Sequence, residues 1–127
     1  MQFCIFAVCA LEAFINQIIP ATYEYDEGSK KSSKKEIERY WTLEYKFKTI
    51  VPEITGISIA SDTKKWKTIT DLISIRNDLI HLKTTYPVVS DFRSYQDMYK
   101  RLLDLNYRET FSVLKNTINQ IATQQSV

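Results

Sequence analysis

Turn-forming residues are scarce in this chain, and their scarcity limits the folds that it can adopt. The whole sequence of 127 residues contains two glycines and three prolines. Architectures rich in β-hairpins need more of both, because their tight turns depend on these residues. Hydrophobic residues make up 44% and charged residues 25% of the chain, which suits a globular protein with a buried core. The sequence therefore predicts an all-α fold.

Apolar residues recur at helical spacing in several segments. Pro20 is predicted to end the first segment, and Pro52 and Gly56 the second, because a proline does not continue a helix comfortably and a glycine often ends one. Ser33 and Glu36 form a capping box at the start of the second segment. The predicted helices cover about residues 3–19, 36–51, 63–83 and 92–121, the last with a kink or break near Asn106. Their connections are of moderate length, so we predict an antiparallel up-and-down bundle of four to five helices.

The length predicts one domain over residues 1–127. Residues 25–35, YDEGSKKSSKK, are polar and rich in lysine. We interpret them as a solvated loop, with a phosphate-attracting loop as the alternative. Asp62 or Thr63 is expected to cap the third helix, and Ser90 or Asp91 the last one. Residues 122–127, ATQQSV, are expected to fray.

Charge and cysteine content indicate the compartment and the classes of partner. The net charge of +2 and the pI of about 8.5 permit contact with nucleic acid without requiring it. Cys4 and Cys9 are close on one predicted helix, where a disulfide is sterically unfavourable, and we interpret them as small core residues in a reducing compartment. The apolar N-terminal run has no Lys or Arg before it and is about half as long as a membrane span. We therefore predict a cytoplasmic protein without membrane contact, metal or cofactor.

The stretch ISIRNDLIHLK, residues 73–83, places an arginine on an apolar helix face. At about 100° per residue, Arg76 lies within roughly 60° of five apolar residues of the same helix. These residues are Ile69, Leu72, Ile73, Leu79 and Ile80. A guanidinium that faces a core is costly unless it is paired or at an interface. Arg76 is therefore predicted to have a partner.

The first predicted helix supplies a candidate partner. Glu12 and Asn16 are one turn apart in a helix that is otherwise apolar, which indicates a buried polar network or a site. A bidentate pair between Arg76 and Glu12 would account for both unusual positions. In the simplest interpretation this pair only fixes the helix register, and His81 is a bystander.

His81 is the only histidine of the chain. Asp78 stands three residues before it, close enough on a helix to orient the imidazole. A histidine that moves a proton and an arginine that stabilises charge on phosphorus suit phosphodiester chemistry. Since acid–base cleavage of RNA uses two proton carriers, a two-fold dimer would supply the second histidine.

The segment RNDLIH, Arg76 to His81, resembles the R-x4-H signature of HEPN domains, in the variant with a polar residue after the arginine. LEAFIN, Leu11 to Asn16, is similar to the first-helix motif of many HEPN proteins. The stretches YKFKTIVPEITG and WKTITDLISIRNDLIH are also similar to such families in order and spacing. The resemblance covers about residues 7–83.

This resemblance implies a helical bundle that forms a homodimer and brings two R-x4-H motifs into one cleft. It implies a metal-independent endoribonuclease in which the 2′-hydroxyl of the RNA attacks phosphorus and leaves a 2′,3′-cyclic phosphate. Arg76 would stabilise the transition state, His81 would act as acid or base, and Asn77 would assist polar contacts at the phosphate. Glu12 and Asn16 would support the site. Since many HEPN nucleases are toxins of toxin–antitoxin pairs or act in anti-phage defence, an antitoxin protein is a candidate partner.

The chain departs from one HEPN subgroup. In toxins that a nucleotidyltransferase antitoxin modifies, a tyrosine stands two residues after the histidine, whereas here that position is Lys83. Some HEPN proteins are not catalytic, so the alternative function is a HEPN-like module that dimerises or binds a partner or nucleic acid. The lysines and the eight tyrosines are interpreted mainly as surface and packing residues, with an RNA-binding cleft as the alternative.

Overall fold

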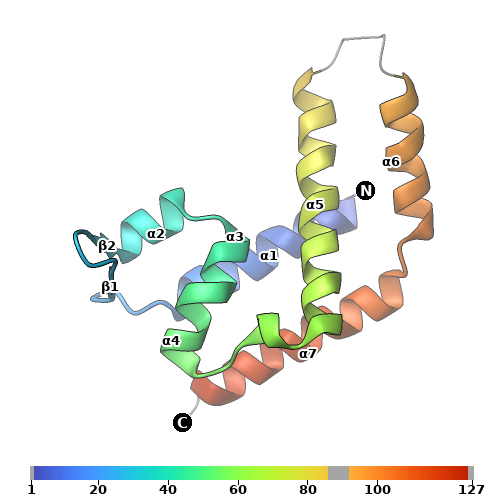
Figure 1. The fold of residues 1–127 in the computed structure, drawn as a ribbon. Coiled ribbons are helices and arrows are strands. Elements are labelled where there is room, and N and C mark those ends of the chain that lie inside the picture. The colour runs from blue at the N-terminus through green and yellow to red at the C-terminus, as the bar shows by residue number, and fades with distance from the viewer. Residues whose placement is uncertain (1, 86–91, 126–127) are drawn as a thin grey trace.

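The computed structural model describes residues 2–85 and 92–125, and these residues form a helical bundle with one short hairpin (Figure 1). The predicted all-α class is confirmed. In chain order the elements are α1 (Gln2–Ile18), β1 (Glu24–Asp26), β2 (Lys31–Ser33), α2 (Lys34–Tyr40), α3 (Leu43–Tyr45), a π-helical segment (Lys46–Ile50), α4 (Val51–Thr55), a 3-10 turn (Ile59–Ser61), α5 (Thr63–Thr85), α6 (Phe92–Asp104) and α7 (Tyr107–Gln125).

The main core lies where α1 and α7 pack against α5. Each of the three helices contributes side chains at intervals of three or four residues, so that one face of each helix is buried. The fully or almost fully buried residues include Val8, Leu11 and Ile15 of α1, Ile69, Leu72 and Ile73 of α5, and Leu114 and Ile121 of α7. No helix in the described part of the chain is long and apolar enough to cross a membrane.

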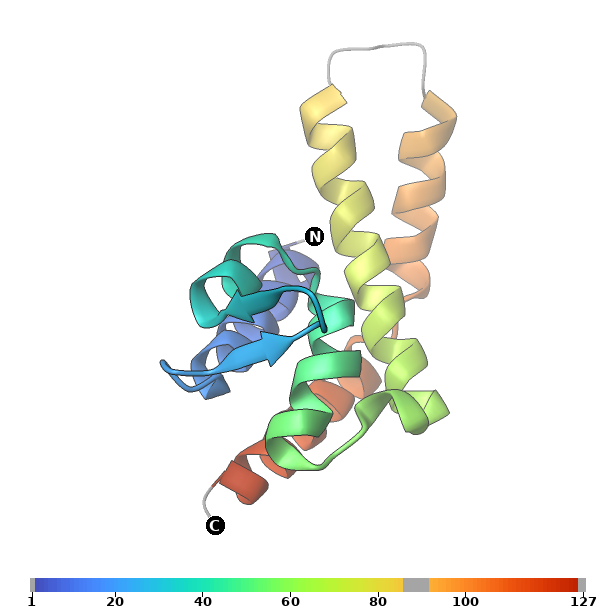
Figure 2. The same cartoon turned by 60° about the vertical axis from the view of Figure 1, so that its left-hand side comes forward.

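Helices α5 and α6 form an antiparallel pair that extends past the rest of the bundle. Figures 1 and 2 both show the C-terminal half of α5 and the N-terminal half of α6 side by side, beyond the level of α1. The RNDLIH segment lies in this extended half of α5. The motif therefore follows the part of α5 that packs in the main core and lies in the part that runs beside α6.

The predicted second helix is interrupted. Its first part, α2, ends at Tyr40, and Thr42 caps α3 by accepting a hydrogen bond from the Tyr45 backbone N at 3.2 Å. Pro52 does not end the helix as predicted, because it lies in the first turn of α4, where its missing N–H costs little. Gly56 ends α4 as predicted, with a φ of 76° in the left-handed region that favours glycine.

The segment predicted as a lysine-rich loop contains a β-hairpin. Strands β1 and β2 pair antiparallel, and the Asp26 carboxylate accepts a hydrogen bond from the Gly28 backbone N at 2.8 Å in the turn between them. Gly28 adopts a φ of 90°, which a side-chain-bearing residue rarely does. Ser33 caps α2 as predicted, since its hydroxyl accepts from the Glu36 backbone N at 3.3 Å. Local hydrogen bonds thus define the turn of the hairpin and the end of β2.

The other predicted helix boundaries have mixed outcomes. Asp62 caps α5, because its carboxylate accepts from the Lys65 backbone N at 3.2 Å. The break near Asn106 is confirmed, since this residue separates α6 from α7 and its side chain accepts from the Glu109 backbone N at 3.0 Å. Helix α7 continues through Gln125, so residues 122–125 are helical where the sequence predicts fraying. The caps predicted at Ser90 or Asp91 lie outside the described residues.

The two cysteines have different environments. Cys4 is fully buried in the main core, and burial raises the pKa of its thiol. Cys9 is exposed on α1, so its prediction as a core residue was wrong. Both are free thiols.

Candidate catalytic site on helix α5

The R-x4-H motif lies on one continuous helix, because α5 runs without a break from Thr63 to Thr85. A separation of five residues places Arg76 and His81 about 140° apart around the helix axis. The two side chains therefore leave α5 from different faces, with Arg76 toward the core and His81 toward solvent.

Arg76 stands in the apolar stripe of α5, as predicted. Leu72, Ile73 and Leu79 around it are all buried, whereas Ile80, also predicted in the stripe, is 41% exposed. The Arg76 side chain is partly buried, and its Nε is buried without a hydrogen-bond partner in the described part of the chain. None of the ion pairs between described residues includes it. Leaving such a donor unpaired costs about 1–3 kcal/mol, so the position requires an explanation.

The partner predicted for Arg76 was wrong. The Glu12 carboxylate lies 3.6 Å from the ammonium of Lys46, and Asn16 accepts a hydrogen bond from the same ammonium at 2.8 Å. Glu12 and Asn16 do form a polar network one turn apart on α1, but the cation at its centre comes from the π-helical segment. The physical reason is the packing of separate elements. The π-helical segment lies against this face of α1 and brings the Lys46 ammonium to Glu12 and Asn16.

Lys46 has no exposed surface and is among the largest fully buried side chains. The backbone carbonyl of Glu38 also accepts from its ammonium at 3.5 Å. Burial lowers the pKa of Lys46, and the nearby Glu12 carboxylate opposes this shift only in part. The sequence contained a signal for this residue, because Lys46 stands three residues after Leu43 and four before Ile50, on the apolar side of the segment.

The exposed face of α5 carries polar side chains that contact α6. The Asp78 carboxylate is paired with Arg101 of α6, and the same guanidinium donates to the Ser74 hydroxyl at 3.3 Å. Asp78 is thus engaged with α6, and its predicted role beside His81 stays a prediction. Arg101 was not identified from the sequence, because it lies 23 residues from Asp78 and only the antiparallel pairing of the helices brings the two together.

Asn77 shares the exposed face with His81. Both residues are exposed, and a separation of four residues places them about 40° apart around the axis. The structure therefore gathers Asn77, Asp78 and His81 on one side of α5, next to Arg101. It keeps Arg76 on the other side and places Glu12 and Asn16 in the network of Lys46.

The described residues do not include a group of three or more His, Cys, Asp or Glu side chains arranged to bind a metal ion. Comparison of the chain with protein families, with curated proteins and with solved structures finds no match. The functional argument therefore depends on the geometry of α5 and its neighbours.

Proposed function

We propose that this protein is a metal-independent endoribonuclease of the HEPN type, which cleaves RNA through attack by the substrate's own 2′-hydroxyl. The observation that carries the proposal is the Nε of the partly buried Arg76, which is buried without a hydrogen-bond partner among the described residues. Buried donors of this kind are rare, and each one calls for a structural or functional reason. The exposed His81 follows five residues later on the same helix.

An arginine and a histidine divide the work of phosphodiester cleavage between them. Arg76 stabilises the negative charge that develops on the phosphate oxygens as the 2′-oxygen attacks phosphorus and the 5′-oxygen leaves. His81 takes the proton from the 2′-hydroxyl or donates one to the leaving oxygen. Asn77, on the same exposed face as His81, donates its amide to a phosphate oxygen. The products are a 2′,3′-cyclic phosphate and a free 5′-hydroxyl.

The working enzyme is a homodimer. The chain contains one histidine, whereas cleavage with both a base and an acid uses two proton carriers. A two-fold axis that brings two copies of α5 together supplies both. The 140° between Arg76 and His81 (about two-fifths of a turn) favours this arrangement, because one phosphate is reached more directly by the arginine of one subunit and the histidine of the other.

The resemblance of RNDLIH and LEAFIN to HEPN motifs supports a role in a toxin–antitoxin pair or in anti-phage defence. In that setting an antitoxin protein is the expected partner. Lys83 stands where the tyrosine-modified subgroup has its tyrosine, so control by modification of that position is not expected.

Cleavage of a mixed-sequence RNA in EDTA tests the proposal, with His81→Gln as the main variant. We expect His81→Gln to lower the cleavage rate about 10²- to 10⁴-fold, the usual contribution of a general acid or base. The product ends should carry 2′,3′-cyclic phosphate, and a 2′-deoxy substitution at the cleaved nucleotide should block the reaction. Cleavage at the wild-type rate by His81→Gln would exclude the catalytic assignment.

A dimerisation module without catalytic activity is the second candidate, and an apolar groove between α1 and α7 favours it. Phe6 and Phe111 are 67% and 59% exposed, and they flank a hollow whose other walls include Ala10, Leu114 and Ile118. Exposed apolar patches of this kind mark protein contacts. Protruding rings beside a hollow on the same surface suit an isologous contact with a second copy.

Sedimentation of the wild type and of Phe111→Glu separates the two candidates. If Phe111→Glu is monomeric, the wild type is dimeric and neither cleaves RNA, the module is the better description. If the wild type cleaves and His81→Gln does not, the nuclease stands whatever surface forms the dimer.

A further inference from the structure

Three aromatic side chains form a row at the end of the molecule that carries the hairpin. Tyr25 of β1 contacts Trp41 edge to face with ring centroids 5.3 Å apart, and Trp41 contacts Tyr45 of α3 at 4.6 Å. Tyr45 retains 46% of its surface exposed. Bases of single-stranded nucleic acids stack on rings of this kind without a strict sequence requirement.

The row is fixed in place by a small hydrophobic core of its own. Ile19, Ile37 and Ile50 are buried at its centre, and Tyr25 and Trp41 pack against them. The rings of Tyr25 and Trp41 are therefore positioned before a ligand arrives, which lowers the entropy cost of binding.

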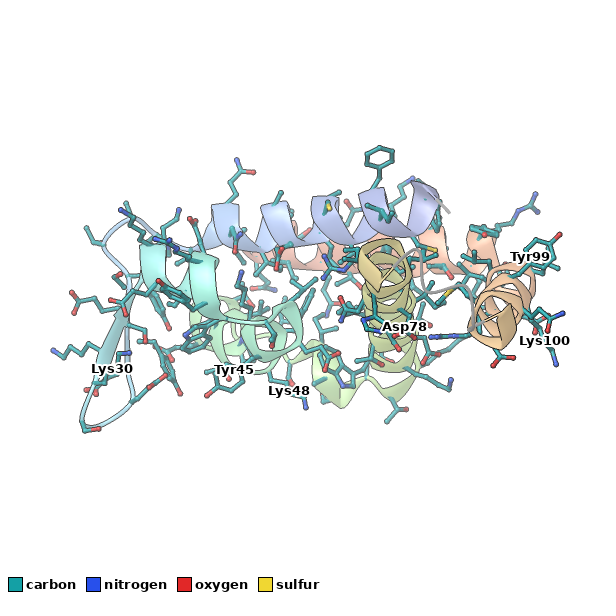
Figure 3. The ribbon with its side chains drawn as sticks, turned by 90° about the horizontal axis from the view of Figure 1, so that it is seen from above. Lys30, Tyr45, Lys48, Asp78, Tyr99 and Lys100 are labelled. Carbon is teal, nitrogen blue, oxygen red and sulfur yellow. The ribbon has the colours of Figure 1, made fainter. Side chains whose placement is uncertain are left out.

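Exposed lysines flank the row. Lys30 and Lys31 extend from the hairpin, and the exposed Lys48 follows three residues after Tyr45, with its ammonium 5.7 Å from the ring centroid of Trp66 of α5, a ring outside the row. Figure 3 shows Lys30, Tyr45 and Lys48 in succession along the edge of the molecule opposite α1. Cations beside a row of rings match the alternation of phosphates and bases along a single strand.

Carboxylates of the same region are engaged in local contacts. The Asp26 side chain accepts from the Gly28 backbone N at 2.8 Å. The Glu38 carboxylate lies 3.7 Å from the Lys34 ammonium. Of these two carboxylates only that of Glu38 is paired with a cation, and the hairpin region also has the exposed Glu24 and Glu27 close in sequence to Lys30 and Lys31.

We propose that this surface is a binding platform for single-stranded RNA. The aromatic platform consists of Tyr25, Trp41, Tyr45, Lys30, Lys31 and Lys48. The proposal rests on the proposed function, because it gives the RNA cleaved at α5 a second contact. In the view of Figure 3, which looks down α5, Lys48 lies between Tyr45 and Asp78.

Fluorescence anisotropy with an unstructured oligouridylate of about 12 nucleotides tests the platform. The His81→Gln background is used throughout, so that cleavage does not remove the probe. We expect Tyr45→Ala to weaken binding about tenfold through loss of one stacked base, and Tyr45→Phe to bind as the parent does. The control is Tyr99→Ala, which removes a more exposed tyrosine (65%) from α6.

Salt dependence tests the lysines separately. If Lys30 and Lys31 contact phosphates, their joint change to alanine should reduce the slope of log affinity against log salt by about 0.7 per lost contact. Lys100→Ala on α6 is the control, and it should leave the slope unchanged.

The outcomes distinguish this proposal from the proposed function. If Tyr45→Ala binds like Tyr99→Ala, the platform is wrong even when the wild type cleaves RNA. If the wild type fails to cleave but Tyr45→Ala loses binding, the platform stands and the nuclease does not. If the parent does not bind oligouridylate, the platform is wrong and its exposed rings indicate a protein partner instead.

Discussion

Lys46 and Arg76 both stand at apolar positions of their helical segments, and their surroundings are opposite. Lys46 is fully buried, and it has a carboxylate, an amide oxygen and a backbone carbonyl around its ammonium. Arg76 is only partly buried, yet its Nε has no partner among the described residues. The more deeply buried cation is thus the better satisfied one. The comparison indicates that Lys46 serves the fold, whereas no hydrogen bond or ion pair between described residues accounts for the position of Arg76.

The largest expected effect concerns Arg76. If the guanidinium stabilises the transition state, Arg76→Met should lower RNA cleavage about 10²- to 10³-fold. Its thermal midpoint should not fall, because the change removes no ion pair between described residues. Arg108→Met, an exposed arginine of α7, is the matched control and should retain full cleavage. A large loss of stability in Arg76→Met would show that Arg76 has a structural partner, and the contrast with Lys46 would disappear.

Loss of the Lys46 ammonium should lower the stability of the folded protein. We expect Lys46→Ala to lower the free energy of unfolding by about 2–5 kcal/mol, because it removes a fully buried side chain, breaks a half-buried pair and leaves a cavity. Lys46→Met fills the volume and should cost less, about 1–3 kcal/mol, since Asn16 then lacks its donor. Urea unfolding of the three proteins measures both differences. Equal stability of Lys46→Ala and wild type contradicts the structural role.

The lowered pKa of Lys46 predicts a dependence of stability on pH. Since the folded-state pKa lies below the unfolded value of 10.5, the unfolded chain binds more protons between these two values. The free energy of unfolding of the wild type should therefore rise with pH across this interval, relative to Lys46→Met. Thermal melts of both proteins at matched pH values give the difference, and parallel curves would contradict the shift.

The smallest expected effect concerns Arg101. Its pair with Asp78 is largely open to solvent, with 39% and 51% of the two side chains exposed. Arg101→Met should therefore cost only about 0.2–1 kcal/mol of stability. A chemical denaturation series with Arg108→Met as reference resolves a change of this size. A loss as large as that in Lys46→Ala would mean that the α5–α6 pair depends on this contact.

Local signals predicted much of the fold. Ser33, Asp62 and Asn106 each cap a helix where the sequence places a boundary, because a cap depends on the side chain and on backbone N–H groups a few residues away. The hairpin was missed, since a strand pair of three residues on each side leaves almost no periodic signal. The break after Tyr40 was missed because the apolar spacing continues across it.

The candidate site was predicted in part. Periodicity alone placed Arg76 in the apolar stripe and indicated a polar network at Glu12 and Asn16. It did not identify the cation of that network, since Lys46 lies 30 residues from Asn16 in the sequence. The same criterion that singled out Arg76, a cation at an apolar position of a helix, applies to Lys46 as well.

The sequence by itself determined the helical class, the caps and the unusual placement of Arg76, because these depend on turn residues and on spacing within one helix. Only the tertiary structure decided which cation meets Glu12, which arginine holds Asp78, and that Tyr25, Trp41 and Tyr45 lie in one row. Each of these is a contact between separate elements. The pattern along a helix specifies which face is buried, whereas packing decides which side chain of another element lies against that face.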